Sequence, residues 1–435
     1  MSNTTRAEAA PAPDAPAILG SKALHRMFAA FTYRDFRVQW LGACTSSVGT
    51  WVQITAQNWM VTSLATESRA AFFLGLDSFL QQLPIMLFTL VGGVLADRRD
   101  SRRTLLSSQY LQMATAAALA LLVFGDYVTI PWILTLSFVT GIAQSFGGPA
   151  YQTLVPSLVD KKDLPNAVAL NSIQFNIARV IGPLLFGVTI AAGTGWGLGD
   201  QQAMALCFAL NAASFLVVIY TLMSLRVKFS PPTQQKSISD ELAGGIRYVR
   251  EQGTLIALIV LAATTTFLGF AVLTFLPVFT KTVFKEGANT YSHLLAFSGA
   301  GSVVGALVVA WMGKFPRMGL TVLLVQVAYG LFIVAFAMSR TMWLSDLLLF
   351  LTGAALMMVF STVTSLVQLT APNEMRGRVM SIYMLAFRGG MPLGSLASGW
   401  AATYIGAPAV LQINGVLLVG VAIYFLIRSH GVREI

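Results

Sequence analysis

The sequence predicts an all-α membrane protein in which twelve transmembrane helices form two pseudo-symmetric six-helix bundles. Of its 435 residues, 56% are hydrophobic and 11% are charged, whereas soluble domains contain about 45–50% apolar and about 25% charged residues. Apolar runs of about 20 residues, the length that crosses a bilayer core, recur along the whole chain. A segment near residue 172 also recurs near residue 381. These observations exclude an ordinary soluble domain and a disordered chain.

Short charged or Gly/Pro-containing breaks separate the apolar runs. The expected spans are 38–63, 71–96, 104–125, 130–151, 166–192, 201–224, 254–280, 292–313, 319–338, 343–369, 378–404 and 408–428.

The distribution of basic residues indicates the orientation. Of 28 Lys and Arg, 22 fall in the two tails and in alternate loops on one side, four fall in the opposite loops and two lie inside spans. Because basic residues are retained in cytoplasmic loops, both termini are expected in the cytoplasm of a multi-pass membrane protein. The net charge of +10 then reflects topology and contacts to anionic lipid. Nucleic-acid binding is not expected.

The polar segments divide the chain into four parts. Residues 1–37 are expected to form a cytoplasmic tail in which 24–37, mixing aromatic and basic residues, lies along the inner headgroups. Residues 38–225 are expected to form the first bundle and residues 254–435 the second. The longest break, 226–253, is expected to be a cytoplasmic linker.

An internal repeat relates the two bundles. SIQFNIARVIGPL, from Ser172, aligns without gaps on SIYMLAFRGGMPL, from Ser381, so that Arg179 pairs with Arg388 and Pro183 with Pro392. Parallel six-helix repeats are typical of one architecture of secondary transporters.

The segment GGVLADRRDSRR, from Gly92, resembles the signature loop between helices 2 and 3 of the major facilitator superfamily. The resemblance depends on Gly93, Asp97, Arg98, Arg102 and Arg103, while Asp100 stands where the common pattern has Gly. This variant, together with LVPSLVDKKDLPNAVALNS from Leu154 and RGRV from Arg376, is similar to the branch that contains the enterobactin exporter and related secretion effectors.

The resemblance implies the major facilitator fold, alternating access, and a cavity lined by helices 1, 4, 7 and 10. It also implies that the Asp97 loop is a cytoplasmic latch that bridges the halves in the outward-facing state, with Arg376 and Arg378 as partners of Asp97. The alternative is that the arginines only fix the topology.

Three charged residues lie deep inside expected spans: Asp77, Arg179 and Arg388. Each buried arginine costs about 2.5–3.5 kcal/mol at a helix centre, so it must face water, protein or a partner. Because the resemblance implies that helix 2 adjoins helix 11, we expect an Asp77–Arg388 pair between the halves. We also expect Asp77 to be the proton-coupling carboxylate and the arginines to be interface or substrate-anion contacts. A static pair, or an arginine that snorkels outward, is the alternative.

Polar and aromatic residues suggest a substrate cavity. Gln53 and Gln57 share one face of helix 1, and Gln144 lies on a polar stripe of helix 4. The matching stretches of the second half carry Phe267, Phe270 and Met358. Such a lining suits an amphipathic, aromatic solute. Interhelical hydrogen bonding and simple packing are the alternatives.

ARVIGP in helix 5 is similar to the Gly-x-x-x-Gly-Pro pattern of exporters, with Ala178 at the first Gly position. Gly182 and Pro183, and Pro392 in helix 11, are therefore expected where these helices bend. The pattern favours export over uptake.

Other classes of function lack their motifs. The sequence has no phosphate-binding G-x-x-x-x-G-K-[ST] loop for an ATP-driven pump, its three histidines lie outside or at the ends of spans, and its two cysteines fall in apolar runs. Neither a metal nor a cofactor is expected. We therefore expect a monomeric secondary transporter of the bacterial inner (plasma) membrane that exports a small amphipathic molecule, a siderophore or a drug-like compound, in exchange for protons. Import of a small organic solute, and a sensor that does not transport, are the alternatives.

Overall fold

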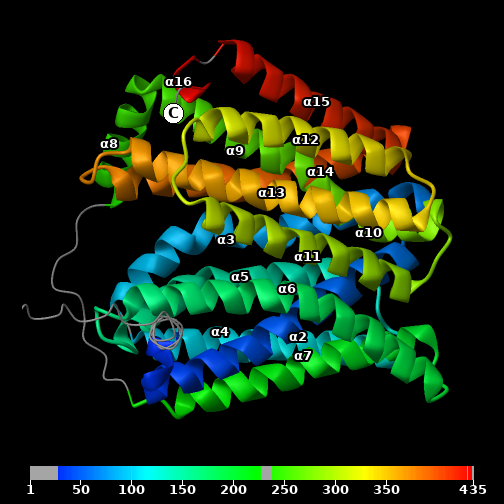
Figure 1. The fold of residues 1–435 in the computed structure, drawn as a ribbon. Coiled ribbons are helices and arrows are strands. Elements are labelled where there is room, and N and C mark those ends of the chain that lie inside the picture. The colour runs from blue at the N-terminus through cyan, green and yellow to red at the C-terminus, as the bar shows by residue number, and fades with distance from the viewer. Residues whose placement is uncertain (1–27, 99, 227–237, 429, 434–435) are drawn as a thin grey trace, which may run out of the picture.

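A computed structural model describes residues 28–98, 100–226, 238–428 and 430–433, except for the side chains of 89–98, 238–243, 430 and 432 (Figure 1). The described residues form helices and contain no strand. The first half consists of α2 (Arg34–Leu64), α3 (Glu67–Arg98), α4 (Ser101–Phe124), α5 (Ile130–Leu154), α6 (Leu164–Gly195) and α7 (Asp200–Met223). The second half consists of α9 (Gly253–Gly269), α10 (Ala271–Val278), the π-helical η4 (Phe279–Val283), α11 (Ala288–Met312), α12 (Met318–Met338), α13 (Met342–Thr370), α14 (Arg376–Ile405) and α15 (Ala407–Arg428). The short elements are η2 (Ala29–Thr32), η3 (Val155–Ser157), α8 (Ile238–Glu251) and α16 (His430–Arg433).

The predicted fold of twelve transmembrane helices in two halves is confirmed. Ten of the described helical segments are long and apolar enough to cross a membrane by length and composition. The other two, α2 and α14, are 31 and 30 residues long. They run beside the others through the two bundles but carry many polar residues along their length (Figure 1).

Two segments differ in detail from the expected spans. The described part of 24–37 contains η2, where the Ala30 N–H donates to Asn166 Oδ1 of α6 at 2.9 Å, and α2 starts at Arg34 rather than at residue 38. The span expected at 254–280 is broken after Gly269 and ends in the π-helical turn η4. Pro277 lies inside α10 and lacks the N–H that would continue the regular helical ladder.

The two halves contact each other where α3 crosses α14 and where α6 crosses α11. The α3–α14 crossing is very close. A Cβ at Gly75 would overlap the Ser395 carbonyl, and one at Gly399 would lie 2.6 Å from the Ala71 carbonyl oxygen. Glycine at these two positions therefore lets the backbones touch.

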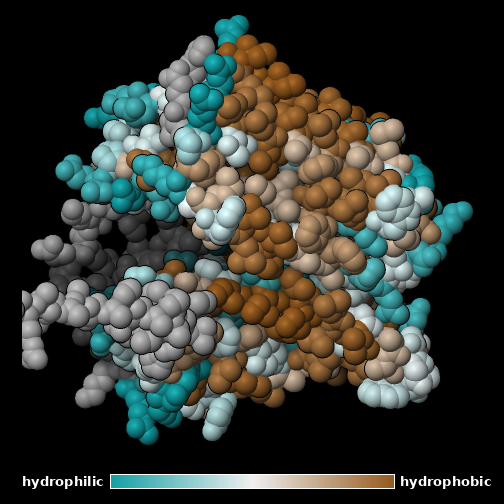
Figure 2. All heavy atoms as spheres, in the orientation of Figure 1, coloured by the Kyte–Doolittle hydropathy of each residue, from teal (hydrophilic) through white to brown (hydrophobic). Residues whose placement is uncertain are grey.

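The hydrophobic cores show which end of the molecule is closed. One core spans both halves and includes Trp59, Phe186, Tyr291 and Phe336, at the end opposite α8 and α16, here called the outer end. At the inner end, near α8 and α16, each half has a core of its own. Figure 2 shows the surface hollowed between the halves at this inner end. The structure is therefore closed at the outer end and open at the inner end.

Candidate transport site

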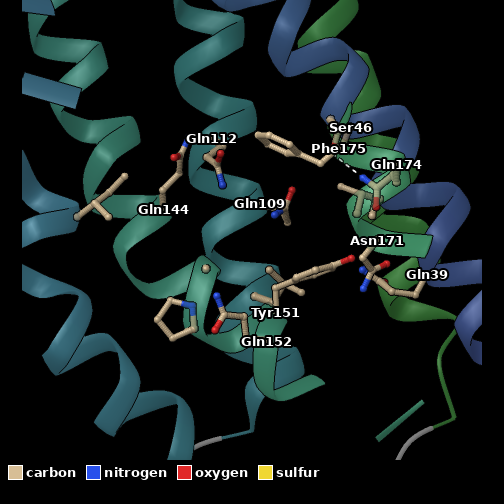
Figure 3. A pocket seen from close by; sticks show the side chains of 18 of the residues that line it. Gln39, Ser46, Gln109, Gln112, Gln144, Tyr151, Gln152, Asn171, Gln174 and Phe175 are labelled. Atoms are coloured by element: carbon tan, nitrogen blue, oxygen red, sulfur yellow. Dashed lines mark hydrogen bonds between the residues drawn. The ribbon is translucent and has the colours of Figure 1, made fainter. Parts of the chain in front are cut away.

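A cavity of about 550 Å³ opens in the inner part of the first half (Figure 3). Amide side chains dominate its polar lining: Gln39 from α2, Gln109 and Gln112 from α4, Gln144 and Gln152 from α5, and Asn171 and Gln174 from α6. Their convergence from four helices makes this cavity the candidate site for a polar solute.

Helix geometry explains why these amides converge. Gln109 and Gln112 are three residues apart, as are Asn171 and Gln174, so each pair lies on one helix face. An amide facing lipid would lack partners, so these faces turn toward the cavity. The Gln174 Nε2 group donates to Ser47 Oγ at 2.7 Å and so fixes the orientation of that amide.

Two aromatic rings complete the lining. Figure 3 shows Tyr151 from α5 and Phe175 from α6 reaching in among the amides. An aromatic contribution to the cavity was expected, but from the second half of the chain. The first half supplies both of these rings.

Arg388 is the only charged residue among the described side chains that line the cavity. It is also the only one of these described lining residues from the second half of the chain. It lies 12 residues into α14, or about 18 Å from the inner end of that helix. The guanidinium is exposed to the cavity, and no described carboxylate lies within 4.0 Å of it.

The predicted Asp77–Arg388 pair is wrong for this structure. Asp77 lies 21 residues from the inner end of α3, or about 31 Å, and is therefore much farther toward the outer end than Arg388. Its carboxylate accepts hydrogen bonds from Gln57 Nε2 at 2.7 Å and from Ser137 Oγ at 2.5 Å. The side chain is only 4% exposed. Asp77 is thus held by neutral groups of its own half.

A narrow polar gap of about 10 Å³ lies between the cavity and Gln57, the residue that donates to this carboxylate. Gln112 and Gln144 line both spaces, and Gln53 and Gln57 line the gap. A volume near 10 Å³ is about that of one water molecule. Polar side chains therefore continue from the cavity to Gln57, which contacts Asp77. Gln144 lies in the cavity as expected, whereas Gln53 and Gln57 lie in the gap beyond it.

The three expected cavity residues of the second half, Phe267, Phe270 and Met358, do not line the cavity. The backbone of Phe267 packs against Gly394 of α14, whereas its side chain is exposed outside the cavity. Phe270 lies at the break between α9 and α10. Met358 is half-buried in α13.

Arg179 and Arg388 occupy comparable depths but different surroundings. Arg179 lies 15 residues into α6, about 23 Å from its inner end. It is half-buried outside the cavity, and its Cζ lies 6.0 Å from the ring centroid of Trp51, a cation–π arrangement. The repeat therefore preserves the depth of the two arginines but not their contacts.

The predicted latch falls partly outside the described side chains, which do not include Gly93, Asp97 or Arg98. Arg102 Nη2 donates to the Met223 carbonyl at 2.6 Å, and Arg103 Nε lies 3.6 Å from Asp100 Oδ2.

On the other side of the predicted latch, Arg376 Nε donates to the Gln368 carbonyl at 3.1 Å, and Arg378 Nη1 lies 3.6 Å from Met375 Sδ. These contacts, like those of Arg102 and Arg103, each lie within one half. The latch remains a prediction.

The Gly-Pro segment of α6 lies at contacts with two neighbouring helices. A Cβ at Gly182 would overlap the side chain of Trp51 on α2. The Pro183 carbonyl accepts a hydrogen bond from Ser292 Oγ of α11 at 2.6 Å, which joins the two halves. Pro392 is buried inside α14.

Residues 25–433 match the transmembrane secretion effector family. The chain belongs to this family of the major facilitator superfamily. The staphyloferrin A transporter of Staphylococcus aureus is 26% identical over 398 residues, 88% of this chain and 94% of the relative. Macrolide efflux protein A of Streptococcus pyogenes is 24% identical over 89% of this chain and 94% of its own length. The enterobactin exporter of Escherichia coli is 25% identical over 92% of this chain and 91% of its own length.

The solved structures show the same fold. The crystal structure of a D-xylose–proton symporter superimposes with a TM-score of 0.72 over 89% of this chain and 96% of the symporter, at 14% identity. The resemblance inferred from the signature loop is confirmed. The protein is a multi-pass membrane transporter of a small molecule and not an enzyme.

Proposed function

We propose that this protein exports a small amphipathic molecule, a siderophore or a drug-like compound, across the bacterial inner membrane in exchange for protons. The observation that carries the proposal is the series of polar side chains that runs from the cavity to Gln57 and, through its hydrogen bond, to Asp77. It joins a space large enough for a drug-sized solute to the one described carboxyl that lies more than two turns from either end of its helix.

The relatives support the choice of cargo. Their names describe the transport of a siderophore, the export of another siderophore and the efflux of macrolides. Two of the three name an outward direction. The similarity to the Gly-x-x-x-Gly-Pro pattern of exporters at Gly182 and Pro183 supports the same direction.

Alternating access follows from the two kinds of core. The inner end is open, and with both termini in the cytoplasm this state would load substrate from the cytoplasm. Rocking of the two halves against each other would open the outer end by separating the residues of the shared core that come from different halves. In that outward-facing state the Asp97 loop would meet Arg376 and Arg378 as the latch. The transporter works as a monomer in this proposal.

The test is proton-driven transport in everted membrane vesicles across a panel of siderophores, macrolides and dyes. Wild-type vesicles should accumulate at least one compound when an inward-acid gradient is imposed, because the vesicle interior corresponds to the outside of the cell. Asp77→Asn should abolish this accumulation, whereas Asp200→Asn, which changes an exposed carboxylate in the first turn of α7, should not.

Three outcomes would contradict the proposal. Wild-type vesicles that lose preloaded compound under the gradient would indicate import. No movement of any compound would favour a sensor without transport. Full proton-driven accumulation by Asp77→Asn would remove the coupling role of Asp77.

A further inference from the structure

The charge of the cavity lining points to the class of molecule that the transport site prefers. Arg388 contributes a positive charge, and none of the described residues lining the cavity is acidic. A guanidinium at this depth, without a carboxylate within 4.0 Å among the described residues, favours a counter-ion brought by the ligand. Among the described lining residues, none offers a cation an opposite charge.

The cavity lining also contains two hydrogen-bond acceptors without a partner in the described structure. The Oε1 atoms of Gln39 and Gln109 are buried and accept no hydrogen bond in the described structure. Gln39 is only 2% exposed, and both side chains line the cavity (Figure 3). A buried carbonyl oxygen without a partner is unfavourable. A ligand hydroxyl or N–H group would satisfy each of them.

We propose that the cavity selects an organic anion that also carries hydroxyl or N–H donors, with Arg388 as the anion contact and the Gln39 and Gln109 carbonyl oxygens as acceptors. This inference rests on the proposed transport role of the cavity and narrows its substrate class. The Phe175 ring provides an apolar surface beside these groups, so the anion can carry a flat ring system. Organic cations of the same size lack the favourable contact and meet Arg388 as a like charge.

Equilibrium binding to the full-length protein in lipid nanodiscs tests this selectivity with two matched dyes. In mildly acidic buffer, fluorescein is a monoanion that carries a carboxylate and a phenolic hydroxyl. Rhodamine 123 has the same xanthene frame, with a methyl ester in place of the carboxylate and a delocalised positive charge. Fluorescence anisotropy, corrected with protein-free nanodiscs, should show that fluorescein binds at least about tenfold more tightly, the effect of one charge-assisted contact.

Three variants assign that preference to residues. Arg388→Gln should weaken fluorescein binding about tenfold or more and leave rhodamine 123 binding unchanged or stronger. Gln109→Glu, which is nearly isosteric, places a carboxylate in the cavity and should reverse the preference. Arg250→Gln changes an exposed arginine of α8 outside the cavity and should bind both dyes as the wild type does. Thermal unfolding of each variant identifies any loss of fold.

Equal or tighter binding of rhodamine 123 by the wild type would overturn the proposal, as would failure of fluorescein to bind. An unchanged preference in a folded Arg388→Gln variant would also overturn it. These outcomes are separate from those of the export test, because binding requires neither a gradient nor a direction. A protein that binds fluorescein but moves nothing would refute export and leave the selectivity standing.

Discussion

Two neutral side chains hydrogen-bond to the carboxylate of Asp77. Gln57 and Ser137 each donate one hydrogen bond to it, and they come from two other helices, α2 and α5. Hydrogen bonds to an ionised group contribute about 1.5–3 kcal/mol each. Removing one of these two hydrogen bonds should therefore change proton binding and release at Asp77 more than it changes the stability of the fold.

Gln57→Leu tests this arrangement. We expect proton-driven transport to fall about tenfold or more, because Asp77 loses one of its two donors. Substrate exchange without a proton gradient should be retained. Gln53→Leu is the matched control, since Gln53 lines the same gap but accepts its hydrogen bond from Asn211. Equal losses in the two variants would show that the gap, rather than the Asp77 contact, is what matters.

The sequence located some of these residues and missed others for a physical reason. The depth of Asp77 and Arg388 follows from their positions in the spans, and the polar face of α2 follows from helical spacing. Which helix faces meet depends on packing between helices, so the amides at Gln109 and Gln174 were not recognised. Their spacing, with a second amide three residues before or after on the same helix, was the available signal.

Among the elements, the α3–α14 crossing is the tightest constraint on how the halves meet at the outer end. The backbones approach so closely at Gly75 that a side chain there would overlap the Ser395 carbonyl. Overpacking such a contact costs about 1–3 kcal/mol. Because the crossing joins the two halves, a larger side chain there destabilises the inward-open conformation, in which the outer end is closed.

Gly75→Leu should therefore shift the population away from the inward-open state by at least about fivefold. The rate of maleimide labelling at Gln152→Cys, in the exposed lining of the cavity, reports that population. Gly420→Leu in α15 is the control, because a Cβ at Gly420 meets nothing within 4 Å. An unchanged labelling rate in Gly75→Leu would mean that the crossing does not hold the outer end shut.

The number and order of the spans were predictable because hydrophobic length and loop charge determine them. The break in the seventh span was harder to predict from the sequence, although Pro277 lies close to it. Its π-helical continuation at η4 depends on tertiary packing, and the sequence alone does not specify it.

On the scale of the whole molecule, the hydrophobic cores define an inward-open conformation. One core is shared by the two halves at the outer end, and each half has a separate core at the inner end. The shared core includes the stacked rings of Trp59 and Tyr291, whose centroids lie 5.8 Å apart and which come from different halves. The separate cores leave the inner end open. Access from the two sides of the membrane should therefore be unequal.

Cysteine accessibility measures that inequality. In a Cys44→Ser, Cys207→Ser background, an impermeant maleimide should label Gln152→Cys readily from the cytoplasmic side. It should label Asn58→Cys at least about tenfold more slowly from the opposite side, because Asn58 donates to the Tyr291 hydroxyl within the closed outer end. Comparable rates would contradict an inward-open resting state. Labelling of Gln152→Cys only from the outside would contradict the assigned orientation.

Because the described lining of the cavity comes almost entirely from the first repeat, the two repeats need not change together. Substitutions in α2, α4, α5 or α6 would then alter what is carried, while Arg388, the described lining residue from the second repeat, would keep its proposed contact with the cargo. Diversification within such a lineage would then leave its record mainly in the amino-terminal half.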